Sequence, residues 1–280
     1  MKKMDERHYC DVLIIGSGVA GLSSAIVLAE QGLDVIVVTK QDTIEESNTY
    51  YAQGGIVSRG IDDSPQILIE DVMQTGDGIS NVDAVRTVAE EGPKLVEEFL
   101  IKKVGVPFTR SAENELVFAR EGGHSRRRIL YCMDSTGRAI EESLVRELKK
   151  HKRIRVFCDY TAIDLMTIPH HSTSPLALYM EPQCIGTYVL NNRTEDVERI
   201  FSSFTILASG GLGRIYQHTT NPLGATGDGF AMADRAGARL INMEYIQFHP
   251  TTLFHKDADG FLISEALRGE GAKLKTKDNV

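Results

Sequence analysis

The sequence predicts a mixed α/β fold, and three successive segments near the N-terminus predict it. Residues 11–15 are apolar after the leading Asp11 and form a candidate buried strand. They run into Gly16-Ser-Gly18-Val-Ala-Gly21, and the good helix formers of residues 22–30 follow, closed by Gly32 as a left-handed helix end. Residues 34–39 then form a second apolar strand. This order is typical of a Rossmann-like β-α-β unit with parallel strands.

Each glycine of the turn has a separate physical role in such a unit. Gly16 permits the tight turn, Gly18 lets the backbone approach a pyrophosphate, and Gly21 lets the helix pack closely on the strand. The helix N-terminus offers unsatisfied backbone N–H groups and the positive end of the helix dipole, which both favour a diphosphate. We therefore expect a dinucleotide site that includes Gly16, Ser17, Gly18, Val19, Ala20 and Gly21.

The rest of the chain predicts a nucleotide-binding domain that carries insertions. Helical periodicity covers residues 83–103, with a break or kink near Gly92-Pro93, and returns at residues 136–150. Four short strands of a meander are expected at residues 155–158, 160–166, 176–180 and 186–190. A buried strand at residues 204–208 should end in a second glycine turn, and residues 169–175 should form a surface loop.

Composition narrows the class of protein further. The chain has 280 residues, is 42% hydrophobic and carries a formal net charge of -8, which argues against a nucleic-acid-binding surface. Residues 12–29 have no charged side chain, like a signal peptide or membrane anchor, but Asp5, Glu6 and Asp11 precede them and three glycines interrupt the run. We therefore expect no membrane segment.

The four cysteines are widely spaced and form no C-x-x-C pair. This spacing supports neither a disulfide framework nor a zinc or iron–sulfur site, so we expect no metal and a reducing, cytoplasmic location.

The end of the second strand carries Lys40 where an acidic residue often binds the ribose. Three interpretations stay open: a contact to a 2′-phosphate, a contact to the adenosine ribose or diphosphate, and a solvated strand end. The following residues 47–56 combine hydroxyls, an amide and paired glycines. Two interpretations of this segment stay open. Its bare backbone packs against a large flat ligand, or it is an ordinary loop.

Several motifs in order resemble the flavoproteins of the succinate dehydrogenase and fumarate reductase group and, within that group, the L-aspartate oxidases. The similarity extends over essentially the whole chain and is carried by these stretches: Tyr51-Ala-Gln-Gly-Gly-Ile56, Arg120-Glu-Gly-Gly-His-Ser-Arg-Arg-Arg-Ile129, Thr226-Gly-Asp-Gly-Phe-Ala-Met-Ala233, Arg235-Ala-Gly-Ala238, Asn242-Met-Glu-Tyr-Ile-Gln-Phe-His-Pro-Thr251 and Ser264-Glu-Ala-Leu-Arg-Gly-Glu-Gly-Ala272.

The resemblance implies FAD as the cofactor and extends the cofactor site beyond the first glycine turn. The further positions that it implies are Lys40, Asn48, Thr49, Tyr50, Tyr51, Ala52, Gln53, Gly54, Gly55 and Asp228. For Asp228, which stands at the head of a predicted helix, an N-cap role is equally expected and is compatible with a cofactor contact. Members of the group that bind FAD covalently carry a histidine where this chain has Asn48. The resemblance therefore implies noncovalent FAD.

The resemblance also implies three substrate residues. Glu121 would accept a hydrogen bond from the substrate ammonium, although the charged run around it also suits a solvated face. His249 would hydrogen-bond a substrate carboxylate, although a lone histidine there also suits a packed core. Ser264 stands where the family usually has threonine and keeps the hydroxyl.

The implied reaction is the FAD-dependent oxidation of L-aspartate to iminoaspartate, with oxygen or fumarate as acceptor. The product would feed quinolinate and NAD synthesis, which suggests a link to quinolinate synthase. The implied architecture is a Rossmann-like FAD-binding domain over residues 1–240 with a β-meander insertion, and the start of an α+β capping domain over residues 241–280. Family members are longer, so we expect a truncated chain. A fumarate reductase or succinate dehydrogenase flavoprotein and a non-catalytic FAD-binding remnant stay as alternatives.

Overall fold

The computed structural model describes residues 7–249, 251–253, 255, 257, 261–263 and 271–278. Its contacts divide the chain into two compact units. The first unit comprises Met1–Tyr50 and Leu144–Pro250, and the second comprises Tyr51–Ser143 and Thr251–Val280. The second unit therefore interrupts the first in sequence, and the domain boundary after residue 240 stays a prediction.

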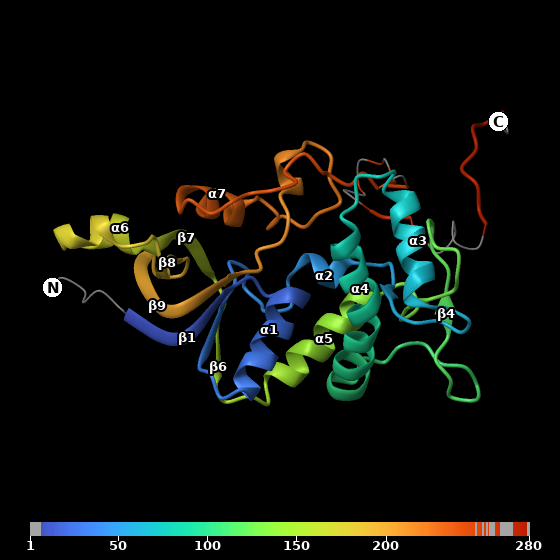
Figure 1. Cartoon of the computed structure of the whole chain (residues 1–280), viewed down its shortest axis with the longest axis horizontal. Coiled ribbons are helices and arrows are strands. Elements are labelled where there is room, and N and C mark those ends of the chain that lie inside the picture. Colours follow the sequence, from blue (N-terminus) through green and yellow to red (C-terminus); the bar gives the residue numbers. More distant parts are fainter. Residues whose placement is uncertain are drawn as a thin grey trace. The chain divides into compact units, whose positions relative to one another are not determined.

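A six-stranded sheet forms the centre of the first unit, in the order β6-β2-β1-β9-β8-β7 (Figure 1). The strands are β1 (Arg7–Ile15), β2 (Val35–Val38), β6 (Ile154–Phe157), β7 (Tyr160–Thr167), β8 (Cys184–Asn191) and β9 (Asp196–Leu207). β6, β2, β1 and β9 run parallel, whereas β7, β8 and β9 form an antiparallel meander. The predicted α/β class is confirmed, and a meander is present, but the strand expected at residues 155–158 belongs to the parallel part, where it pairs with β2.

The sheet is stabilised by a core of side chains from both its parallel and its antiparallel part. β2 is buried along its whole length, as expected for a central parallel strand. The buried cluster consists of Leu13, Ile15, Ile36, Val38, Leu165, Val189, Ile200 and Met232. The meander thus shares one core with the nucleotide-binding strands.

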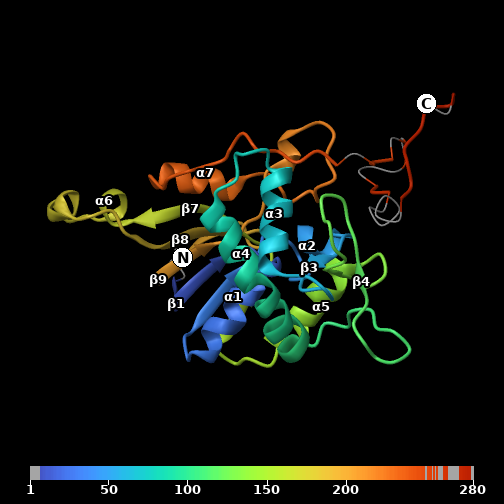
Figure 2. The same ribbon diagram turned by 45° about the vertical axis from the view of Figure 1, so that its right-hand side comes forward.

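Helix α1 (Val19–Glu30) connects β1 to β2 and ends as the sequence predicts, because Gly32 has a φ of 86°. The other helical segments of this unit are α6 (Ile168–His171), the 3₁₀ turns η2 (Pro175–Tyr179) and η3 (Gly213–Ile215), and α7 (Asp228–Arg235), which contacts β7. Figure 2 shows α6 next to the end of β7. The predicted loop at residues 169–175 therefore contains a short helix.

Two further predictions are wrong for this unit: strand formation at residues 176–180 and burial of the strand at residues 204–208. Residues 176–180 form no strand, because Pro175 begins a 3₁₀ turn whose apolar side chains Leu176 and Leu178 are exposed. Residues 204–207 lie in β9 as expected, but Phe204 is 70% exposed rather than buried. An apolar run predicts a strand, whereas the burial of its side chains depends on what covers each face.

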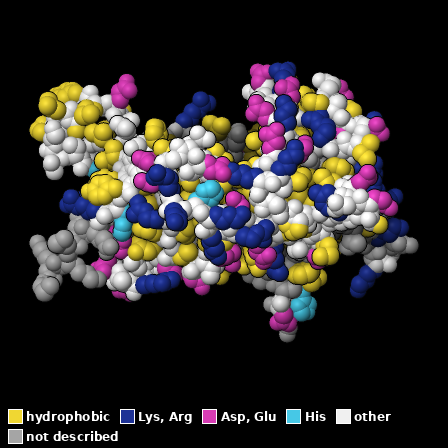
Figure 3. Space-filling view, turned by 90° about the horizontal axis from the view of Figure 1, so that it is seen from below, with side chains coloured by type: hydrophobic (Ala, Val, Ile, Leu, Met, Phe, Trp, Pro, Cys, Tyr) yellow, Lys and Arg dark blue, Asp and Glu magenta, His cyan; other side chains and the backbone are white. Residues whose placement is uncertain are grey.

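Both signs of charge are interspersed on the face drawn in Figure 3. Near the end of α5 (Thr136–Leu148), Lys150 pairs with Glu147 at 2.6 Å. At the start of β6, Arg153 pairs with Asp34 at 2.9 Å. Such exposed ion pairs contribute little to stability and serve mainly solubility.

The second unit has a small antiparallel sheet in the order β3-β5-β4, formed by β3 (Ile56–Val57), β4 (Phe118–Ala119) and β5 (Ile129–Leu130). Helices α3 (Pro65–Thr75) and α4 (Val82–Leu95) lie side by side (Figures 1 and 2). Ser64 and Asn81 cap their N-termini through side-chain oxygens. The short α2 (Asn48–Tyr51) and α5 each cross the division between the two units.

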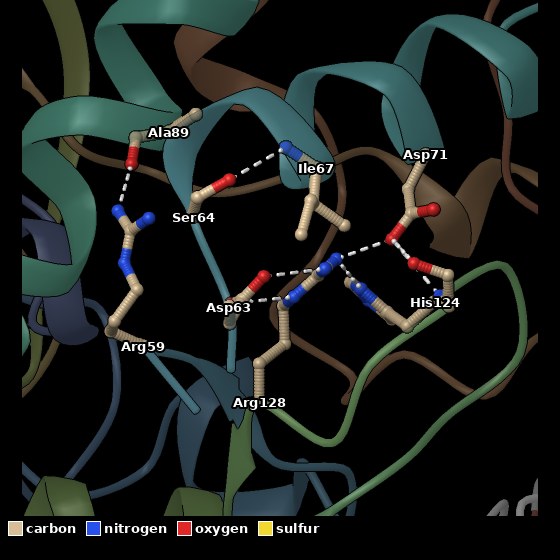
Figure 4. A network of polar contacts seen from close by, with 9 residues as sticks. Arg59, Asp63, Ser64, Ile67, Asp71, Ala89, His124 and Arg128 are labelled. Atoms are coloured by element: carbon tan, nitrogen blue, oxygen red, sulfur yellow. Dashed lines mark hydrogen bonds and ion pairs between the residues drawn. The ribbon is translucent and has the colours of Figure 1, made fainter. Parts of the chain in front are cut away.

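The helix predicted to break or kink near Gly92-Pro93 does not break there, because α4 (Val82–Leu95) contains the proline. α4 runs to Leu95, and a π-helical segment η1 (Val96–Val104) follows it. Pro93 has no N–H group, so the buried carbonyl of Ala89 lacks its usual partner four residues on. Arg59 Nη2 donates to this carbonyl at 2.8 Å, as Figure 4 shows. A distant side chain thereby replaces the missing helical hydrogen bond.

We expect Arg59→Met to lower the free energy of unfolding by about 1 to 3 kcal/mol, because it leaves the Ala89 carbonyl buried without a donor. Pro93→Ala restores a backbone N–H, so it should stabilise the Arg59→Met variant more than the wild type. Urea unfolding of the four proteins in this double-mutant cycle measures the difference. Equal effects of Pro93→Ala in both backgrounds would contradict the assignment.

Candidate functional site

The first glycine turn has the close approaches that the sequence predicts. Gly16 has a φ of 117°, and a Cβ atom there would lie 2.2 Å from the carbonyl oxygen of Ala208. A Cβ atom on Gly21 would lie 2.0 Å from the carbonyl oxygen of Gly16. Only glycine leaves room at both places, so strand β1 can turn sharply into α1 and pack against it.

The N-terminus of α1 has no cap from its own N-cap residue, and one of its N–H groups is bonded to a threonine from another segment. Gly18 is the N-cap residue, and no side chain caps the helix from that position. The Val19 N–H donates to Thr49 Oγ1 at 3.0 Å. Val19 and Ala20 are exposed, whereas Ser17 is buried at the base of the turn. The first turn of α1 thus presents exposed backbone next to a hydroxyl, at the positive end of the helix dipole.

Lys40, just after β2, forms an ion pair with Asp228, the first residue of α7. Lys40 Nζ also donates to Thr226 Oγ1 at 2.7 Å, and the Thr226 hydroxyl donates to Asp228 Oδ1 at 2.8 Å. Lys40 is half-buried in this triad, which is not the environment of a freely solvated strand end. The triad connects the ends of two segments that are far apart in sequence.

The N-cap role expected for Asp228 is wrong. Gly227, with a φ of 80°, is the N-cap residue of α7, and Asp228 follows it inside the first turn. Burial raises the pKa of the Asp228 carboxyl, but the hydrogen bonds from Lys40 and Thr226 outweigh burial and bring the pKa below its usual range. Asp228 is therefore ionised at neutral pH.

The segment that follows β2 is held against the first glycine turn. Ser47 Oγ accepts the Tyr50 N–H at 3.3 Å and so supports the first turn of α2. Asn48 is exposed, and its Oδ1 accepts a hydrogen bond from Asn221 Nδ2 at 3.4 Å. Thr49 reaches the start of α1 as described above. The predicted positions Asn48 and Thr49 thus lie within one hydrogen-bonded region of the first unit.

In the second unit, Glu121 lies against the paired glycines. The Gly55 N–H donates to Glu121 Oε1 at 2.9 Å. A Cβ atom on Gly55 would lie 2.2 Å from Ile129 Cγ2, so only bare backbone fits between Glu121 and β5. A Cβ atom on Gly54 would lie 3.6 Å from Glu121 Oε1. Glu121 is therefore bonded to the last residue of the predicted segment Tyr51, Ala52, Gln53, Gly54 and Gly55.

The charged run next to Glu121 is only partly a solvated face. Arg126 and Arg127 are exposed, but Arg128 is fully buried between two aspartates (Figure 4). Arg128 donates twice to Asp63, at 2.9 and 3.0 Å, and once to Asp71 at 2.5 Å. Sequence reasoning missed this cluster; the available signal was an arginine directly before the apolar pair of β5.

His124 and Ser125 complete the cluster. Arg128 can only donate, so His124 Nδ1, 3.1 Å from Arg128 Nη1, must accept and carries no proton. Burial, with Arg128 acting in the same direction, lowers the pKa of His124. Burial raises the pKa of Asp71, but hydrogen bonds from Ser125 and Arg128 bring it below its usual value. At neutral pH the cluster holds neutral imidazole and ionised carboxylate.

The predicted substrate residues belong to different parts of the chain. His249 is half-buried in an irregular segment of the first unit, and Glu121 belongs to the second unit. Ser264 lies outside the described residues. Their substrate roles stay predictions.

All four cysteines are free in the structure, and Cys132 is buried. Burial raises the pKa of Cys10 to about 11 and also raises those of Cys132 and Cys158. Within the described ranges, no helix is long and apolar enough to cross a membrane. The same ranges hold no group of three or more acidic, histidine or cysteine side chains that is arranged to bind a metal ion.

Comparisons with known proteins agree with this geometry. The chain is 42% identical over 279 residues to the L-aspartate oxidase of Acinetobacter baylyi, a match that covers 99% of the chain and 50% of that protein. It is 43% identical over 276 residues to the chloroplastic L-aspartate oxidase of Arabidopsis thaliana, covering 95% and 41%. The chain spans about half the length of the curated relatives that it matches.

Solved structures show the same fold. A variant of E. coli quinol fumarate reductase superposes with a TM-score of 0.87 at 26% identity, covering 98% of this chain and 44% of the other. The Sdh1 complex of Mycobacterium smegmatis in the apo form gives a TM-score of 0.82 at 32% identity, covering 97% and 46%.

The model of an FAD binding domain matches residues 11–280, which is nearly the whole chain. The N-terminus of α1, which has no N-cap side chain, and the sharp turn that Gly16 and Gly21 permit suit the diphosphate of such a cofactor. The chain therefore belongs to the FAD-binding domain family, and FAD is its cofactor.

Proposed function

We propose that this chain is the FAD-binding part of an enzyme that oxidises L-aspartate to iminoaspartate, with oxygen or fumarate as the electron acceptor. The observation that carries the proposal is the Glu121 carboxylate, held by the Gly55 amide in the glycine segment. The similarity to L-aspartate oxidases at 42% identity supports it. The product would supply quinolinate synthesis, with quinolinate synthase as a functional partner and the cytoplasm as the compartment.

Glu121 can distinguish an amino acid from a plain dicarboxylate. One carboxylate oxygen accepts the Gly55 N–H, and the other is left to accept from a substrate ammonium. A charge-assisted hydrogen bond of this kind favours L-aspartate, whereas the same charge repels a dicarboxylate without an amine. His249 and Ser264 are proposed to bind the substrate carboxylates. Bound FAD supplies the hydride acceptor for the Cα hydrogen.

The residues of the first unit are proposed to hold the cofactor. The first turn of α1, from Gly18 onward, would bind the diphosphate through backbone N–H groups. Lys40 and Asp228 form a neutral pair beside the end of β2, where the adenosine half of a dinucleotide binds in such folds. This pair would contact the cofactor without adding net charge.

A succinate dehydrogenase or fumarate reductase type of flavoprotein is the second candidate. The superpositions with TM-scores of 0.87 and 0.82 favour it. Such an enzyme acts on dicarboxylates that carry no amine, so it would give Glu121 no ammonium to bind. Asn48 also has no nucleophilic ring nitrogen, such as the histidine nitrogen that binds FAD covalently in some members of that group.

The proposal is tested with Glu121→Gln in the protein at its natural length. Glutamine keeps an acceptor for the Gly55 N–H but loses the charge, so we expect kcat/KM for L-aspartate to fall about tenfold to hundredfold. Fumarate reduction should change much less, because fumarate has no ammonium. The exposed Glu115→Gln serves as the control. Equal losses with both substrates would show that Glu121 acts only on the structure.

We expect Gly18→Val to weaken FAD binding about tenfold or more, because the side chain would occupy the space that the diphosphate needs. Gly18 has an extended backbone that a side chain can adopt, and a Cβ atom there would lie 3.2 Å from Thr49 Oγ1. Flavin content after gel filtration and a fluorescence titration measure the loss. Gly92→Ala, in α4, is the matched glycine control. Normal flavin content in Gly18→Val would place the diphosphate elsewhere.

We expect acid precipitation to release intact FAD into the supernatant. The Asn48 amide is not nucleophilic and cannot form the covalent link that a histidine forms at this position in tethering relatives. The measurement is the flavin absorbance, at about 450 nm, of the supernatant and of the dissolved pellet. It distinguishes released FAD from FAD that is bound covalently. Flavin that stays in the pellet would show a covalent bond.

A further inference from the structure

The loop over residues 121–128 is attached to the rest of the second unit at both of its ends. At one end, Glu121 Oε1 accepts the Gly55 N–H at 2.9 Å. At the other end, Arg128 is fully buried and its main chain bonds to Ser58 and Ala119. The attachment of Arg128 is therefore coupled to the placement of Glu121 through only seven intervening peptide bonds.

Asp71, on helix α3, is the centre of the second attachment. Its Oδ2 atom accepts from the Ser125 N–H at 2.9 Å, the Ser125 hydroxyl at 3.0 Å and Arg128 Nη1 at 2.5 Å. One carboxylate oxygen thus binds two separate points of the loop (Figure 4). A charged acceptor with three donors constrains the loop more strongly than neutral contacts would.

Between these attachments, the loop makes a tight turn. The His124 N–H donates to the Glu121 carbonyl at 3.3 Å, and Gly123 has a φ of 82°. His124 Nδ1 in turn accepts from Arg128 Nη1. A continuous series of contacts therefore runs from Asp71 through Arg128 and His124 to the backbone of Glu121.

We propose that Asp71 and Arg128 are positioning residues that set the Glu121 carboxylate against Gly55 and so determine the preference for an amino dicarboxylate. This inference rests on the proposed function of Glu121. Neither residue needs to touch the substrate, because each acts through the loop. Releasing the loop should loosen the Glu121–Gly55 hydrogen bond before it affects the rest of the fold.

The test uses the FAD-loaded protein at its natural length and the variants Asp71→Asn and Ser125→Ala. Both variants leave the paired contacts between Arg128 and Asp63 in place, which keeps the buried guanidinium partnered. Ser125 is exposed, so its replacement by alanine removes one hydroxyl contact without opening the core. Asp83→Asn, which breaks the exposed Asp83–Arg86 pair in the same unit, is the matched control.

Two readouts separate positioning from general stability. The first is hydrogen exchange at the Gly55 amide, which should become about tenfold faster in Asp71→Asn, and less so in Ser125→Ala, while Asp83→Asn leaves it unchanged. The second is the ratio of Kd values for L-aspartate and succinate, followed by the flavin absorbance. The preference for L-aspartate should fall about threefold to tenfold in Asp71→Asn.

A double variant decides whether Asp71 acts through Glu121. If it does, adding Asp71→Asn to Glu121→Gln should not lower the preference further. Additive effects, or a Gly55 exchange rate in Asp71→Asn equal to that in Asp83→Asn, would overturn the inference. A wild-type protein with no preference for L-aspartate over succinate would instead overturn the proposed function. In that case the hydrogen-exchange rate of the Gly55 amide would still decide whether Asp71 positions Glu121.

Discussion

The close backbone approach around Gly16 is the constraint on which the geometry of the first unit depends. The Gly16 N–H donates to the Val38 carbonyl at 2.9 Å, and the Ala208 N–H donates to the Ile15 carbonyl at 2.8 Å. The carboxyl ends of β1, β2 and β9 are thereby joined at one point. A side chain at position 16 would push β9 away, since its Cβ would lie 2.2 Å from the Ala208 oxygen.

That junction explains why Lys40, two residues after β2, meets Asp228 at the start of α7, although 188 positions separate them. Ligands of parallel α/β sheets bind at the carboxyl ends of the strands, and this pair lies at that edge of the sheet.

The sequence predicts those parts of the fold that depend on local physical rules. The β1-α1-β2 unit is confirmed because its glycines, helix formers and apolar strands act over a few neighbouring residues. Pro93 shows the limit of this reasoning, because the hydrogen bond that Arg59 donates to Ala89 offsets the missing N–H from 30 residues away. A local rule for proline contains no information about such a partner.

The same limit applies to burial and to the candidate site. Phe204 is apolar and lies in a strand, yet it is exposed, because covering a sheet face requires a second element. Arg128 is charged, yet it is fully buried, because Asp63 and Asp71 supply the acceptors from α3 and the residues before it. The motif around Glu121 was recognisable from sequence, but the two aspartates that bind its Arg128 lie 57 and 65 positions away from that arginine.

The partners of the acidic side chains finally suggest which of them is available to a substrate. Asp63 and Asp71 are paired with Arg128, and Asp228 is paired with Lys40. The described contacts give Glu121 a hydrogen bond from a neutral backbone amide instead. A neutral donor orients a carboxylate and leaves its charge uncompensated. A cation orients the carboxylate and also cancels its charge. The hydrogen bond from Gly55 therefore fixes the direction of the Glu121 carboxylate without pairing it with a cation, and selective binding of an ammonium group requires such an arrangement.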